Sequence, residues 1–120
     1  MNGRVDESLR ALVDVTIHRT DSDPPTVVTV WIDTAFTGFL VFPLNMIEKL
    51  GLQQEAATEA ILADGSRVIL ESFVCQVEWF GEVVRAQVTS NKGKLPLLGT
   101  ELLARRRLLI DYQAGVVSIT

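Results

Sequence analysis

The chain has 120 residues, 48% of them hydrophobic and 22% charged, a balance that excludes a disordered chain and fits one domain with a workable core. Its net charge of −4 gives no electrostatic basis for binding nucleic acid, and no apolar run approaches the roughly 20 residues of a membrane span. The single cysteine excludes an internal disulfide and, with a polar N-terminus unlike a signal peptide, indicates a cytoplasmic protein.

The N-terminal part of the chain predicts a polar segment followed by a hairpin. Residues 1–10 are polar and carry both charge signs, so we assign only residues 11–120 to the folded domain. Residues 12–17 alternate apolar and polar side chains, which predicts a half-buried strand. The turn-forming residues 19–25 connect it to a second strand over residues 26–33.

The middle of the chain predicts one short helix and further hairpins. Residues 43–50 begin with proline and are followed by glycine, as expected for a helix. The polar stretch 53–59 predicts irregular structure. Apolar runs on both sides of Asp64-Gly65 predict a hairpin over residues 60–70 with a type I′ turn. A second tight turn is expected at Gly81-Glu82.

The C-terminal part predicts a short strand, a helix and a last hairpin. The strand covers residues 95–99, and Thr100 is the expected N-cap of a helix over residues 101–106 that ends in three arginines. Residues 108–111 and 116–119 predict two paired strands. The whole chain therefore predicts a mostly-β domain of seven to nine strands and two short helices, arranged as a small closed or partly closed barrel.

One carboxylate stands out, at Asp33. It ends a strand of β-branched residues and is followed by Thr34 and Ala35, while apolar segments continue on both sides, so we expect its loop to lie inside the protein. An ionised carboxylate buried without partners costs several kcal/mol. Asp33 is therefore either a functional group or a buried turn residue that accepts hydrogen bonds from backbone N–H groups.

Other reactive side chains are few. Asp64 and Asp111 each precede a glycine-containing turn and are interpreted as turn residues. His18 is expected at the surface and Cys75 in the core. With one histidine and one cysteine, the chain lacks the parts of a Cys–His or Ser–His catalytic system and of the common zinc sites, so we expect no metal and no cofactor. Carboxylate chemistry is what remains.

An ordered set of motifs resembles the retropepsin-like (clan AA) aspartic proteases. The small prokaryotic single-domain type has an Asp-Thr-Gly-Phe active loop, then Gly-Phe-Leu and a helix begun by proline. The matching motifs here are Trp31-Ile32-Asp33-Thr34-Ala35, Gly38-Phe39-Leu40, Leu50-Gly51-Leu52, Ala63-Asp64-Gly65 and Leu97-Leu98-Gly99.

The resemblance implies an aspartic endopeptidase that acts as a homodimer. In this family two carboxylates about 3 Å apart share one proton and activate a water molecule. Because this chain supplies only one such aspartate, Asp33, the resemblance implies a C2 dimer with a single active site on the axis. The expected partners are a second copy of the chain and a peptide or protein substrate.

The resemblance also assigns roles around Asp33. Thr34 would reach the partner's loop, and Gly99 would let the strand of Leu97 and Leu98 pass close behind the Asp33 loop. The hairpin tip would form a flap over the substrate, and residues 116–120 would supply interface strands. The residues expected to contact substrate are Phe36, Ile61, Leu62, Ala63, Asp64 and Gly65.

One position departs from the family pattern, because Ala35 stands where the family has glycine. Its N–H can still bind the carboxylate, but its methyl group adds volume at a crowded axis, where overpacking costs typically about 1–3 kcal/mol. A positive φ at this position would add strain. Besides an active peptidase, two hypotheses stay open: a catalytically weak or inactive dimer that binds a peptide or partner protein in its groove, and a purely structural β domain.

Overall fold

The computed structural model describes residues 1–61 and 63–120, which form ten strands and two short helices. The sequence predicted both helices. It predicted no strand in residues 1–10 or 53–59, whereas the structure has strands at residues 2–5 and 53–61. The elements are β1 (Asn2–Val5), β2 (Ala11–His18), β3 (Thr26–Ile32), β4 (Leu40–Pro43), α1 (Leu44–Leu50), β5 (Gln53–Ile61), β6 (Arg67–Trp79), β7 (Glu82–Asn91), β8 (Leu97–Leu98), α2 (Thr100–Leu103), β9 (Leu108–Asp111) and β10 (Val116–Ile119).

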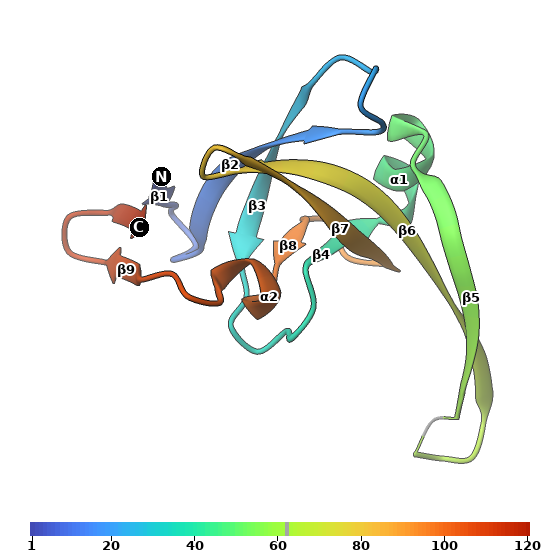
Figure 1. Cartoon of the computed structure of the whole chain (residues 1–120). Coiled ribbons are helices and arrows are strands. Elements are labelled where there is room, and N and C mark those ends of the chain that lie inside the picture. The colour runs from blue at the N-terminus through green and yellow to red at the C-terminus, as the bar shows by residue number, and fades with distance from the viewer. Residues whose placement is uncertain (62) are drawn as a thin grey trace.

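The strands form one strongly curved sheet, in the order β5-β6-β7-β4-β8-β3-β2-β1-β10-β9. Because β6 also pairs with β2, the middle of this sheet curls into a partial ring. The outer half of the β5–β6 hairpin projects away from the body, and both termini lie together beside β1 and β9 (Figure 1). This arrangement confirms the predicted mostly-β domain. Among the described residues, neither α1 nor α2 is long and apolar enough to cross a membrane.

The core lies inside the ring and follows the period-2 pattern of the strands. Val13 and Val15 of β2 and Val30 of β3 are buried, while Asp14 between the first two is exposed. Cys75 is 1% exposed, and burial raises the pKa of its thiol to about 12, which confirms the predicted core thiol.

The prediction of irregular structure at residues 53–59 is wrong, because β5 pairs with β6 from Gln53 to Ile61, with an irregularity between Gln54 and Ala56. β5 is the edge strand of the sheet, so this pairing satisfies the backbone groups on one of its edges, and its described side chains are exposed. β6 pairs with β7 only from Ser72 onward, so the outer half of the hairpin consists of its own two strands alone.

Near the tip of this hairpin, only Gly65 has a positive φ among residues 63–66, and Asp64 accepts a hydrogen bond from the Ser66 N–H at 2.9 Å. The expected type I′ turn is therefore absent from these residues.

The other tight turn lies one residue earlier than predicted. Trp79 pairs with Glu82, and the two residues between them, Phe80 and Gly81, have φ values of 50° and 79°. Positive φ at both central residues is the geometry of a type I′ hairpin.

Pro43, expected as the first helical residue, instead ends β4 and precedes α1, while Gly51 ends α1 in the left-handed conformation as predicted.

The second helix is shorter than predicted and begins differently. It ends at Leu103, so the arginines follow the helix, and Arg106 lies over the Phe80 ring at 3.8 Å. Gly99, and not Thr100, is the residue before the first helical turn, and no side chain caps it. The first helical N–H groups need no cap because they donate to carbonyl groups of the loop after Asp33.

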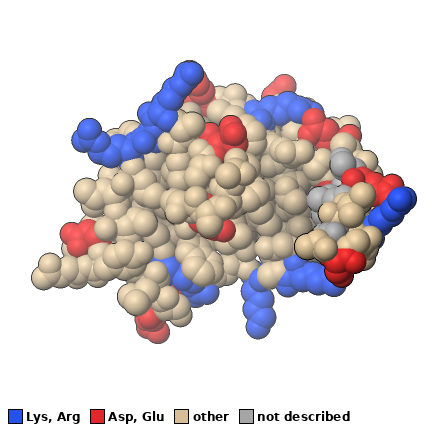
Figure 2. Space-filling view, turned by 90° about the horizontal axis from the view of Figure 1, so that it is seen from below, with Lys and Arg blue, Asp and Glu red and all other residues tan. Residues whose placement is uncertain are grey.

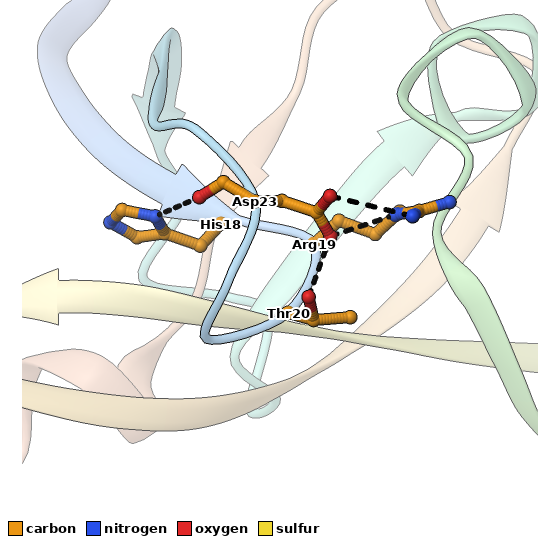
Figure 3. Close-up of polar contacts among 4 residues, drawn as sticks. All are labelled: His18, Arg19, Thr20 and Asp23. Carbon is orange, nitrogen blue, oxygen red and sulfur yellow. Dashed lines mark hydrogen bonds and ion pairs between the residues drawn. The ribbon is translucent and has the colours of Figure 1, made fainter.

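The turn between β2 and β3 is held by polar contacts around Asp23 (Figure 3). Arg19 and Thr20 donate to its carboxylate at 3.0 Å and 2.6 Å. These hydrogen bonds, of which the one from Arg19 has the larger effect, hold the pKa of Asp23 below its usual value.

His18 is half-buried and not a free surface residue, because its Nδ1 lies 3.1 Å from the Asp23 carbonyl oxygen and its Nε2 lies 2.6 Å from Oε2 of Glu78. Both nitrogens face acceptors, so both contacts are hydrogen bonds only when the ring is doubly protonated.

These contacts predict a pH-dependent contribution of His18 to stability. Glu78, followed by the Asp23 carbonyl, raises the pKa of His18 above its unfolded value of about 6.5. The stabilisation is therefore fully present below pH about 6.5 and lost as the pH rises through the folded-state pKa. We expect the melting temperature of wild type to exceed that of His18→Gln more at pH 5.5 than at pH 9. An equal difference at both pH values would contradict this assignment, and Glu78→Gln should remove the pH dependence in the same way.

Candidate active site at the Asp33 loop

The loop from Asp33 to Phe39 joins β3 to β4 and fixes the Asp33 carboxylate through backbone contacts. The Asp33 N–H donates to the Leu98 carbonyl at 2.9 Å, and the Ala35 N–H donates to Oδ1 of Asp33 at 3.0 Å. Within residues 1–61 and 63–120, the second carboxylate oxygen accepts no hydrogen bond. One oxygen is thus oriented by the backbone, and the other is available to another group.

The loop lies at the surface of the single chain, so the expectation that it lies inside the protein is wrong. Asp33 is half-buried, and Thr34 and Ala35 are exposed. The loop lies on the lower side of the body in Figure 1, below β3 and β4, and the view from below shows lysine and arginine side chains around the edge of this face and some acidic side chains nearer its middle (Figure 2). Ala35 is not among the described residues with positive φ, so the methyl group creates no backbone strain.

The back of the loop packs tightly against Gly99. A Cβ at Gly99 would overlap the Gly38 carbonyl oxygen and lie 2.8 Å from the Phe36 carbonyl oxygen. The Thr100 N–H donates to the Phe36 carbonyl at 2.9 Å, and the Glu101 N–H donates to the Gly38 carbonyl at 3.2 Å. The start of α2 therefore holds the loop from behind, and only glycine leaves room for this contact.

A depression of about 320 Å³ lies beside the Asp33 carboxylate. Its lining includes Trp31 and Ile32, which belong to the Asp33 motif but were not among the expected substrate contacts. Trp31 is 38% exposed because it points away from the core side of β3. An aromatic residue at an outward position next to Asp33 was the available signal. The complete lining is Trp31, Ile32, Asp33, Thr34, Ala35 and Leu97.

The structure does not bring the other expected substrate contacts into this depression. The ring of Phe36 lies on the inner side of the loop, against Gly38 and Gly99. Ile61 and residues 63–65 are exposed on the projecting hairpin, which extends on the same side as the Asp33 loop (Figure 1). Leu62 lies outside the described residues. Leu98 is buried behind Asp33 and acts through its carbonyl group.

The fold is similar to three solved structures of known proteins. A retropepsin-like aspartic protease from Rickettsia conorii superposes with a TM-score of 0.69 at 12% identity, over 98% of this chain and 86% of that one. The EIAV protease in complex with the inhibitor HBY-793 gives 0.54 at 17% identity, over 83% and 90% of the two chains. The retroviral protease-like domain of Ddi1 from Leishmania major gives 0.50 at 14% identity, over 90% and 87%.

Neither a protein-family model nor a curated protein matches the sequence. The likeness to the three structures nevertheless extends over most of each chain, so the fold is retropepsin-like, as the sequence motifs implied.

The contact behind the loop predicts that Gly99→Ala destabilises the protein. The added Cβ would meet backbone carbonyl oxygens, which cannot move without shifting the Asp33 loop, so we expect the free energy of unfolding to fall by about 1–3 kcal/mol or more. Urea denaturation measures this. Gly93→Ala is the matched control, because its Cβ would approach only the Asn91 side chain, at 3.2 Å. Equal stability of the two variants would contradict the proposed packing.

Proposed function

We propose that this chain is an aspartic-type endopeptidase that acts as a homodimer, with one Asp33 from each subunit. The observation that carries the proposal is the backbone-held Asp33 carboxylate, which has one oxygen free of hydrogen bonds in the described chain and lies on a retropepsin-like fold. Two of the similar structures are proteases, from Rickettsia conorii and from EIAV, and the EIAV protease is bound to an inhibitor.

The exposure of the loop supports a dimer. A single chain presents one such carboxylate, and it lies at a face whose lysine and arginine side chains are around the edge (Figure 2). A two-fold axis that passes beside this loop would bring a second Asp33 opposite the first and bury both loops. The Thr34 hydroxyl makes no hydrogen bond within the described residues, so it is free to bind the partner's loop.

Two carboxylates about 3 Å apart would share one proton, because both cannot be ionised at that distance. The ionised carboxylate takes a proton from the water molecule between them while the water oxygen attacks the scissile carbonyl carbon. The protonated carboxylate donates to the carbonyl oxygen and stabilises the charge that develops there. The tetrahedral diol then breaks its C–N bond: the carboxylic acid that took the water proton donates it to the leaving amine nitrogen, and one diol hydroxyl returns a proton to the other carboxylate, which restores the pair.

The remaining residues have supporting roles in this proposal. The Ala35 N–H orients the carboxylate, and Gly99 allows the close packing that fixes the loop. Trp31 and Leu97 form apolar walls beside the reacting groups. The projecting β5–β6 hairpin would act as a flap, since within the described residues its outer half pairs only between its own two strands.

A second candidate function is a dimer that binds a peptide in the same groove without cutting it. The observation that favours it is Ala35, whose exposed methyl group lies on the face that the partner would cover. Two such methyl groups at the axis could hold the carboxylates too far apart to share a proton.

The first prediction of this proposal concerns Asp33. Purified wild type should cleave extended apolar peptides most rapidly at acidic pH, since one carboxylate of the pair must remain protonated, and a statine-like inhibitor should stop the reaction. We expect Asp33→Asn to lower kcat/KM by at least roughly 10²–10⁴-fold, the usual contribution of an acid–base group. Asp21→Asn, at an exposed position of the β2–β3 turn, is the control. Cleavage that persists in Asp33→Asn would exclude the proposed role.

A second prediction separates the two candidates at Ala35. If its methyl group only crowds the axis, Ala35→Gly relieves about 1 kcal/mol of overpacking, and kcat/KM should rise severalfold. An inert wild type combined with an active Ala35→Gly variant would instead favour the binding-only dimer. Activity that is equal in both proteins would show that the methyl group does not crowd the dyad.

A further inference from the structure

A second hollow of about 460 Å³ lies on the outer side of β3, between this strand, α1 and the loop before β8. We call it the β3 groove. Its apolar lining includes Val27, Met46, Leu95 and Pro96, and two lysines, Lys49 and Lys94, also line it. Val27 is 64% exposed, which is a large apolar exposure for a strand residue in a single domain.

The charged side chains that line the β3 groove are both positive, opposite in sign to the net charge of the protein. The chain has a net charge of −4, yet two of its three lysines line the groove and the third, Lys92, is two residues from Lys94. Neither Lys49 nor Lys94 forms an ion pair within the described residues. In contrast, Arg19, near the same end of β3, is paired with Asp23. Unpaired cations around an apolar hollow complement an apolar side chain flanked by carboxylates.

The backbone of β3 beside the groove is paired on one edge. Residues 26–31 pair with β2, whereas β8 pairs only with Trp31 and Ile32. A peptide in the groove would therefore be selected by the side chains that line it and could also pair with the backbone of residues 26–29. We propose that the β3 groove binds a short peptide segment that carries an apolar residue between acidic residues.

The β3 groove is continuous with the Asp33 site. It shares Lys94 and Leu95 with a hollow that is also lined by Trp31 and Leu97, and these two residues line the depression beside Asp33. Val27 and Asp33 are roughly 20 Å apart along the strand, at about 3.3 Å per residue. An extended peptide of about seven residues anchored in the groove would reach Asp33.

The test is a binding measurement that does not involve cleavage, so its outcome is independent of the proposed peptidase activity. The probe is a fluorescein-labelled peptide of alternating Glu and Leu, compared by fluorescence anisotropy with a second peptide that has Gln in place of every Glu. We expect tighter binding of the Glu peptide and weaker binding as the NaCl concentration rises. The double variant Lys49→Glu/Lys94→Glu should weaken binding about tenfold or more, since two attractive surface pairs become repulsive.

Arg105→Glu is the matched control, because it reverses one exposed charge that follows α2 and does not line the β3 groove. It should bind the Glu peptide as wild type does. Equal affinity for the Glu and Gln peptides, or unchanged binding by the double lysine variant, would overturn the proposal. Self-association that the lysine variant abolishes, without peptide binding by wild type, would also overturn it and assign the groove to a second copy of the chain.

Discussion

The close contact between the Asp33 loop and the chain at Gly99 is the constraint on which the candidate site depends. The loop carries no regular structure of its own, and its carbonyl groups receive the first N–H groups of α2. This exchange satisfies the start of a helix that has no side-chain cap and, at the same time, fixes the backbone that orients the Asp33 carboxylate. Because the contact leaves no space for a Cβ, one glycine links the stability of the domain to the geometry of the site.

The other side of the loop is open, and in our proposal this asymmetry leaves the single chain incomplete as a catalyst. The hydrophobic core of the domain lies behind the loop, whereas Thr34 and Ala35 face solvent. A carboxylate that is oriented by one N–H and has a free oxygen needs a second acid group to form a proton-sharing pair. In our proposal the second copy of the chain supplies that group, and Ala35 is the residue that decides how closely the two copies approach.

Much of the fold could be predicted from local pattern, because alternating burial and turn residues act over short distances. The strands of residues 12–17 and 26–33, the end of α1 at Gly51 and the last hairpin have the expected places. The prediction failed where distant partners decide the structure. β5 is a strand because β6 lies beside it, and α2 begins at Thr100 because loop carbonyl groups accept its N–H groups.

The candidate site was predicted in the same uneven way. The motif around Asp33 identified the carboxylate and its Ala35 partner, since both lie within three residues. The exposure of the loop could not be derived, because apolar segments on both sides say only that the flanking strands are buried. Trp31 was overlooked as a substrate contact for a related reason, since an outward aromatic residue gains a role only when its neighbour Leu97, far along the chain, is known to lie beside it.

The most direct test of the central claim is a crystal structure of the wild-type protein, in which the distance between the Asp33 carboxylates of two copies is measured. We predict a two-fold dimer with carboxylate oxygens about 3 Å apart around one water molecule. A dimer in which the Ala35 methyl groups hold the carboxylates well apart, or in which the Asp33 loops face away from each other, would contradict the proposed catalytic pair.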